Sequence, residues 1–184
     1  MGLDHWGWFE TPNRRFVGPG LTHLTVLPHL DWLRLGGCRI ENPAVEALAT
    51  IKSLQYVDLF HDQITDEGIP QLRSLPDLRV IKLGPQFTPR ITDASLEHLS
   101  AIPMLEEIHC SETWLTYAKG FVHLKRLPKL RLVALVKVLA TEEDIAKLRA
   151  DHPQAEVQWT QPDAAVSERM KSAFERHWKR QEKK

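Results

Sequence analysis

The chain has 184 residues, 42% of them hydrophobic, which is enough to bury the core of one domain but too short for two domains and a linker. Its 24 Lys and Arg residues balance its 24 Asp and Glu residues, so no overall field draws the chain to nucleic acid or to an anionic membrane. No stretch approaches the roughly 20 apolar residues that cross a bilayer, which argues against a transmembrane helix.

The N-terminal segment, residues 3–27, is predicted to be a divergent copy of a repeat that is clearer further along the chain. Its motif Leu3-x-x-Trp6-x-Trp8 aligns with Leu78-x-x-Ile81-x-Leu83. The open end of a stack of repeats needs a cap, and we expect the two tryptophans to supply it.

Five clearer copies follow, each with a leading leucine and two later apolar residues at alternating positions. They are Leu30-x-x-Leu33-x-Leu35, Leu54-x-x-Val57-x-Leu59, Leu78-x-x-Ile81-x-Leu83, Leu105-x-x-Ile108-x-Cys110 and Leu130-x-x-Val133-x-Leu135. The alternation predicts a strand in each unit. The three-residue spacing of Ile69, Leu72 and Leu75 then predicts a short helix, so each unit is a strand, a turn and a helix.

Threonine and aspartate stand where those helices should begin. Thr65-Asp66, Thr92-Asp93 and Thr116 are predicted to cap three of the helices, and Thr141 with Asp144 forms a looser capping box ahead of a fourth. Residues 155–159 then read as a closing edge strand. About six units of 24 to 27 residues plus this strand make one domain, residues 1–160.

These units resemble the leucine-rich-repeat superfamily, in particular its ribonuclease-inhibitor-like and cysteine-containing types and short bacterial members. The resemblance rests on Gln63-Ile64-Thr65-Asp66-Glu67-Gly68-Ile69, on Arg90-Ile91-Thr92-Asp93-Ala94-Ser95-Leu96, and on Cys38 at a turn position. It implies an α/β right-handed solenoid with a parallel concave sheet and convex helices, and it implies recognition of very diverse partners.

The last segment, residues 161–184, is predicted to be a separate amphipathic helix capped by Asp163. From Asp163 to the end it holds seven Lys and Arg against four Asp and Glu, so it is mildly basic. Three uses remain open: folding back onto the solenoid, docking a partner through Met170, Phe174 and Trp178, or binding nucleic acid or a membrane surface through residues 163–184.

Side chains between the core leucines of each strand should point to the concave face. We predict that this face binds a partner protein through aromatic and charged residues in its N-terminal half. The candidates are Trp32, Arg34, Tyr56, Asp58, Phe60, Lys82 and His109. For Arg34, Asp58 and Lys82 the alternative is a charge ladder that only stabilises the sheet, and for the aromatics it is cover by the C-terminal helix.

Motifs for catalysis are missing from this sequence. There is no His-Glu-x-x-His, no Cys-x-x-Cys and no phosphate-binding glycine loop, so we predict neither enzyme activity nor a metal or cofactor. Cys38 and Cys110 fall three units apart, too far for a disulfide. Free thiols and the lack of a signal-like start favour the cytoplasm.

The favoured interpretation is therefore a non-catalytic protein-interaction module or scaffold. One alternative is a basic-tailed adaptor for nucleic acid or a membrane surface, and another is a structural or self-associating subunit of a larger assembly.

Overall fold

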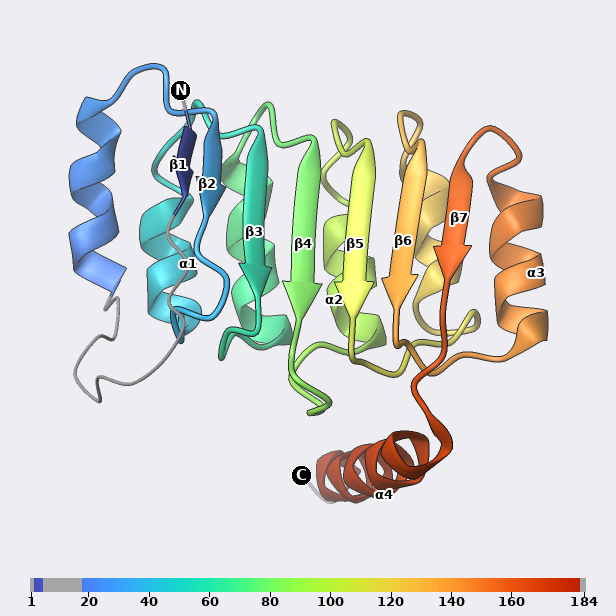
Figure 1. Cartoon of the computed structure of the whole chain (residues 1–184). Helices are drawn as coiled ribbons and strands as arrows, with labels where there is room; N and C mark the ends of the chain where they lie inside the picture. The colour runs from blue at the N-terminus through green and yellow to red at the C-terminus, as the bar shows by residue number, and fades with distance from the viewer. Residues whose placement is uncertain (1, 5–17, 183–184) are drawn as a thin grey trace.

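The computed structural model describes residues 2–4 and 18–182 and forms a right-handed solenoid with one parallel sheet (Figure 1). The sheet has seven strands in chain order: β1 Gly2–Asp4, β2 Trp32–Arg34, β3 Tyr56–Phe60, β4 Val80–Gly84, β5 Glu107–Ser111, β6 Leu132–Val136 and β7 Glu156–Trp159. The predicted α/β solenoid with a C-terminal helix is confirmed.

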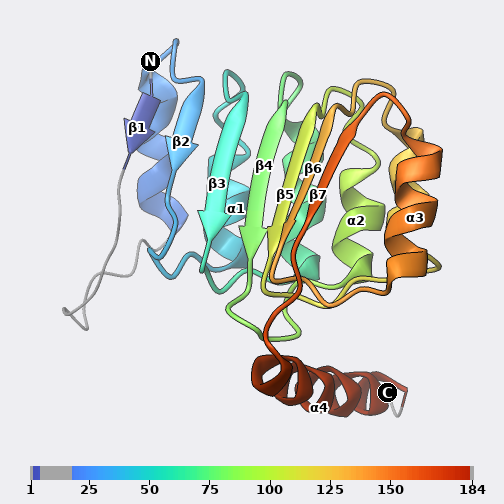
Figure 2. The ribbon, with the colours of Figure 1, turned by 45° about the vertical axis from the view of Figure 1, so that its right-hand side comes forward.

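Helical elements cover one face of this sheet and leave the other uncovered (Figures 1 and 2). They are η1 Gly18–Val26, α1 Asn42–Leu48, η2 Asp66–Ser74, α2 Asp93–Leu99, η3 Phe121–Arg126 and α3 Glu142–Asp151. Three of them, η1, η2 and η3, are 3-10 helices. In η2, Pro70 inside the helix lacks the backbone N–H that an α-helical turn would use.

The core is a stack of aliphatic side chains, one layer per strand. Register pairing places Leu33, Val57 and Ile81 directly beside one another, and all three are buried. Since no unit can bury its apolar side alone, the stacking of neighbours supplies the hydrophobic stabilisation, about 25 cal/mol for each Å² removed from water.

The predicted N-terminal register is wrong by three residues. Leu3, and not Trp6, pairs with Leu33, so Asp4 lies beside Arg34 where the alignment expected Gly7. Both registers fit an alternation of apolar residues along the strand, because Leu3 also lies between two residues that are not large and apolar, Gly2 and Asp4. The predicted tryptophan cap, Trp6 and Trp8, lies outside the described residues.

The threonines before the helices have two different functions. Thr141 forms the predicted capping box with Asp144, and the Thr92 side chain accepts the backbone N–H of Ala94, so both caps are confirmed. Thr65 is the N-cap residue of η2, as predicted, but makes no side-chain capping hydrogen bond within that helix. Because η3 begins only after Gly120, the prediction that Thr116 caps it is wrong.

Those two threonines instead bond to the preceding unit. Asn42 accepts the Thr65 backbone N–H at 2.9 Å, and Asp93 accepts the N–H and the hydroxyl of Thr116, both at 2.8 Å. Asp66 does the same for Thr92, at 2.8 Å and 2.7 Å. The Thr-Asp motif therefore joins neighbouring repeats, which explains its recurrence.

The C-terminal helix α4, Ala164–Gln181, folds back across the ends of strands β4 to β6 (Figures 1 and 2). It begins at Asp163, whose carboxylate accepts the Val166 backbone N–H at 2.9 Å. Its apolar side, Met170 and Phe174, is fully buried with Leu139. Of the three uses that the sequence left open, the structure shows the first, in which the helix folds back onto the solenoid.

Met170 and Phe174, two of the residues named for a possible partner contact, pack on the solenoid instead, and Trp178 is partly buried in the same cluster. Trp114, which follows β5, packs against Trp178 in a tilted arrangement with ring centroids 4.9 Å apart, and against Phe174 at 6.1 Å. Phe87, in the loop after β4, packs on the same cluster. The loops of the solenoid thus supply the apolar surface that the helix needs.

Candidate functional site

The uncovered face of the sheet, called the open face below, presents the predicted residues in register. Adjacent positions run Trp32, Tyr56, Val80, Glu107 and Leu132 in one row, and Arg34, Asp58, Lys82, His109 and Ala134 in the next. The structure therefore brings Trp32, Arg34, Tyr56, Asp58, Phe60, Lys82 and His109 onto one surface of β2 to β5.

Four of these side chains form one continuous stack across β2, β3 and β4. The Arg34 guanidinium lies 5.1 Å from the Trp32 ring centroid, and the Trp32 and Tyr56 rings are 5.3 Å apart. The Lys82 ammonium lies 5.4 Å from the Tyr56 ring. Cation–π contacts of this kind contribute roughly 0.5 to 1 kcal/mol each at exposed sites, so the stack holds two half-buried aromatics in fixed positions.

Asp58 lies beneath this stack and is only 5% exposed. Its Oδ2 is 3.2 Å from the Arg34 Nε, and its Oδ1 accepts the Phe60 backbone N–H at 3.1 Å. A buried carboxylate is costly unless it is paired in this way. Asp58 therefore orients Arg34 and is itself too buried to contact a partner broadly.

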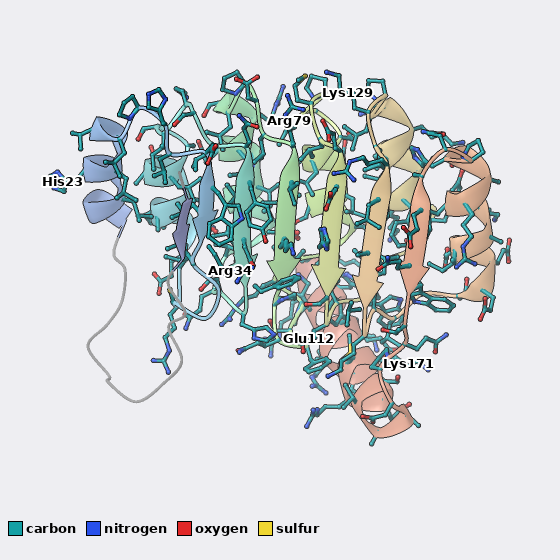
Figure 3. All side chains as sticks on the ribbon, turned by 45° about the horizontal axis from the view of Figure 1, so that its top comes forward. His23, Arg34, Arg79, Glu112, Lys129 and Lys171 are labelled. Atoms are coloured by element: carbon teal, nitrogen blue, oxygen red, sulfur yellow. The ribbon has the colours of Figure 1, made fainter. Side chains whose placement is uncertain are left out.

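Phe60 has a structural role beside any binding role. A Cβ added at Gly84 would come within 3.0 Å of the Phe60 Cδ1 and still closer to the Ser111 hydroxyl, so these side chains close over Gly84. Next to Phe60, His61 reaches the carboxylate of Glu112 at 3.3 Å. Figure 3 shows Glu112 at the strand ends nearest α4, so this pair lies where the open face meets the loops under α4.

A second charged group surrounds Glu107 on β5. Its Oε2 is 2.9 Å from the His109 Nε2, and its Oε1 accepts a hydrogen bond from the Arg131 guanidinium at 2.5 Å. Burial lowers the pKa of His109, partly opposed by the bond to Glu107. Glu107 and Arg131 were not predicted as site residues.

On β6 the open face is apolar, whereas on β7 it carries Glu156 and Gln158. Leu132 is half-buried, Ala134 is buried and Val136 is 49% exposed. The aromatic and cationic character of the face therefore belongs to β2 to β4, as the residue types of the rows had indicated.

One titratable residue near this surface, Asp62, was not predicted to have an unusual pKa. Asp62, in the turn after β3, is 2% exposed, and burial raises its pKa to about 8. Its Oδ1 accepts the Ile40 backbone N–H at 3.0 Å, while its Oδ2 has no hydrogen-bond partner among the described residues. It occupies the same turn position as Cys38, so the repeat pattern gave its place but not its protonation.

Both cysteines are buried, and burial raises the pKa of Cys110 to about 12. Within residues 2–4 and 18–182, no group of three or more His, Cys, Asp and Glu residues is placed to hold a metal ion. No helix in that same part of the chain is both long and apolar enough to cross a membrane.

Comparison with known proteins identifies relatives by structure alone. No model of a protein family matches the chain, and no curated protein does. Internalin C2 from Listeria monocytogenes superposes with a TM-score of 0.55 and 20% identity, covering 79% of this chain and 60% of that one. The TLR13 chain of a TLR13–ssRNA13 complex superposes with a TM-score of 0.56 and 18% identity, covering 76% of this chain and 21% of that one.

The chain thus spans less than two thirds of both matched chains, and identities of this size bear on the fold alone. Both matched proteins are leucine-rich-repeat proteins, and both are similar to this chain in its stacked parallel strands. The chain therefore has the leucine-rich-repeat fold.

Proposed function

We propose that the protein is a non-catalytic interaction module that binds a partner protein on its open face. The observation that carries this proposal is the stack of Arg34, Trp32, Tyr56 and Lys82. Aromatic side chains and arginine supply most of the affinity at protein interfaces, and pre-positioned side chains lose little entropy on binding. A sheet surface without a partner has no structural need for such a cluster.

The helix layer gives the natural comparison for this surface. Its outward residues, such as Arg73, Glu97 and Lys147, are exposed and mostly charged, as expected for a face in contact with water alone. The two faces of the solenoid thus differ in chemistry, and the difference favours the open face as the binding surface.

The test is affinity purification from a native lysate with quantitative mass spectrometry. Trp32→Ala plus Tyr56→Ala should lower recovery of the specific partner at least about tenfold, because this pair forms the centre of the stack. Arg73→Ala plus Glu97→Ala, two exposed helix-face changes, is the matched control and should leave recovery unchanged. Equal recovery of every protein by both double variants would refute the proposal.

The basic-tail adaptor remains a proposal of a different class. The outward side of α4 carries Arg169, Arg176 and Arg180, all exposed, while its apolar side is occupied by the solenoid. Binding through this side should weaken steeply as salt rises, whereas binding through the aromatic stack should not. A structural subunit or self-associating solenoid would be recognised by light scattering, and cytoplasmic location remains a proposal as well.

A further inference from the structure

We propose that Lys82 receives a carboxylate side chain from an acidic segment of the partner protein, lying on the open face beside Tyr56. This inference rests on the proposed function and adds the chemistry of the partner to it. It is carried by the charge balance of the open face on β2 to β5.

The other charges of this part of the face are matched within the chain. Arg34 pairs with Asp58 at 3.2 Å. Glu107 accepts from Arg131 and lies 2.9 Å from His109. Each of these groups therefore meets a partner with its charge already compensated.

Lys82 differs from them, because no described carboxylate forms an ion pair with its ammonium group. Its strand neighbours are Asp58 and His109. Both Asp58 oxygens are engaged, one by Arg34 and one by the Phe60 backbone N–H. Burial lowers the pKa of His109, and its imidazole already contacts Glu107, so His109 offers no negative charge to Lys82.

The position of Lys82 also suits a ligand. Its ammonium lies over the Tyr56 ring at 5.4 Å, and the side chain is half-buried, so its conformation is already restricted. An added carboxylate would find a partly desolvated cation whose ordering cost is largely met. The adjoining Tyr56 and Trp32 rings would cover the aliphatic part of the same segment.

A displayed library of random peptides of about twelve residues provides the probe, selected against the intact protein. The wild type should enrich peptides with Asp or Glu at one fixed position. Lys82→Met keeps an unbranched side chain over Tyr56 but removes the charge. It should abolish that enrichment and weaken the selected peptides about tenfold, which corresponds to about 1.4 kcal/mol.

The chain contains a matched control on the opposite face. Lys147 lies over the Tyr117 ring at 5.5 Å, almost the geometry of Lys82 over Tyr56. Lys147→Met should therefore leave the selection and the affinities unchanged. A melting temperature measured for each variant separates lost binding from lost folding.

Two results would overturn the inference. Acidic peptides that bind Lys82→Met as tightly as the wild type would contradict it, as would an absence of acidic enrichment. If non-acidic peptides are selected and are lost on Tyr56→Ala, the inference fails while the proposed function stands. If selected peptides ignore both residues, both fail.

Discussion

At the scale of single residues, Asp62 shows how a repeat position can carry an unexpected charge state. Its carboxyl is buried, its Oδ2 has no hydrogen-bond partner within residues 2–4 and 18–182, and burial raises its pKa from an ordinary value near 3.8 to about 8. The folded protein therefore keeps a proton that the unfolded chain releases. Between about pH 4 and pH 8, stability falls as the pH rises, because unfolding frees this group to ionise.

Asp62→Asn should remove that dependence, since an amide can replace the protonated acid and still accept the Ile40 backbone N–H. Urea unfolding at about pH 8.5 should show the variant more stable than the wild type by about 1 to 3 kcal/mol, with a smaller gain near pH 5. The exposed Asp77→Asn is the control. A variant less stable than the wild type at the higher pH would contradict an Asp62 that is protonated in the fold.

Asp66 illustrates a different residue-scale effect, the bond between repeats. It accepts the backbone N–H and hydroxyl of Thr92 and the hydroxyl of Ser95, the last at 2.5 Å. Asp66→Ala would leave these buried donors without a partner and should destabilise the protein by about 2 to 4 kcal/mol in urea unfolding. Asp77→Ala, at an exposed site, should change the free energy of unfolding little. If Asp66→Ala destabilises the protein no more than Asp77→Ala does, the hydrogen bonds between repeats do not stabilise the fold.

At the scale of elements, the repeat pattern predicted the strands and their register from β2 to β7, because buried aliphatic residues recur with the unit. It could not fix the strand before β2, where Leu3 and Trp6 both satisfy the alternation. The threonines also misled, because a cap and a bond to the next repeat need the same side chain at the same position.

The candidate site was predictable in part for the same reason. Alternation along each strand placed Trp32, Tyr56 and Lys82 on the open face, yet the stack and the pairing of Asp58 depend on side-chain conformations that a sequence does not specify. For α4, an apolar stripe has the same pattern whether it covers a partner or the solenoid. In the structure, α4 covers the apolar surface that surrounds Trp114 in the loops of the solenoid.

The packing of α4 on Trp114, Phe87 and Leu139 leads to a prediction about the stability of this helix. Phe174→Ala removes a fully buried ring, and an 18-residue helix without tertiary contacts is marginal in water. Hydrogen exchange measured by mass spectrometry should show α4 amides losing most of their protection while strands β3 to β6 keep theirs. The exposed Glu175→Ala should change neither; retained protection of α4 in Phe174→Ala would contradict the packing described here.

At the scale of the whole molecule, the surfaces of the solenoid differ in chemistry. Helices and their charged residues face water on one side, α4 covers the rim after β4 to β6, and the open face keeps an aromatic and cationic surface uncovered (Figure 2). Because α4 docks on the rim, its apolar residues do not cover the stack of Trp32 and Tyr56. The open face is thus the surface on which a partner is expected.

Site-specific photo-crosslinking can test whether a partner binds the open face. A photoreactive phenylalanine derivative replaces Tyr56 on the open face, Glu97 on α2 or Arg176 on the outward side of α4, and each protein is irradiated in native lysate. We expect one partner protein to be captured from position 56 and not from the other two. Capture from position 97 or 176, with none from position 56, would contradict it.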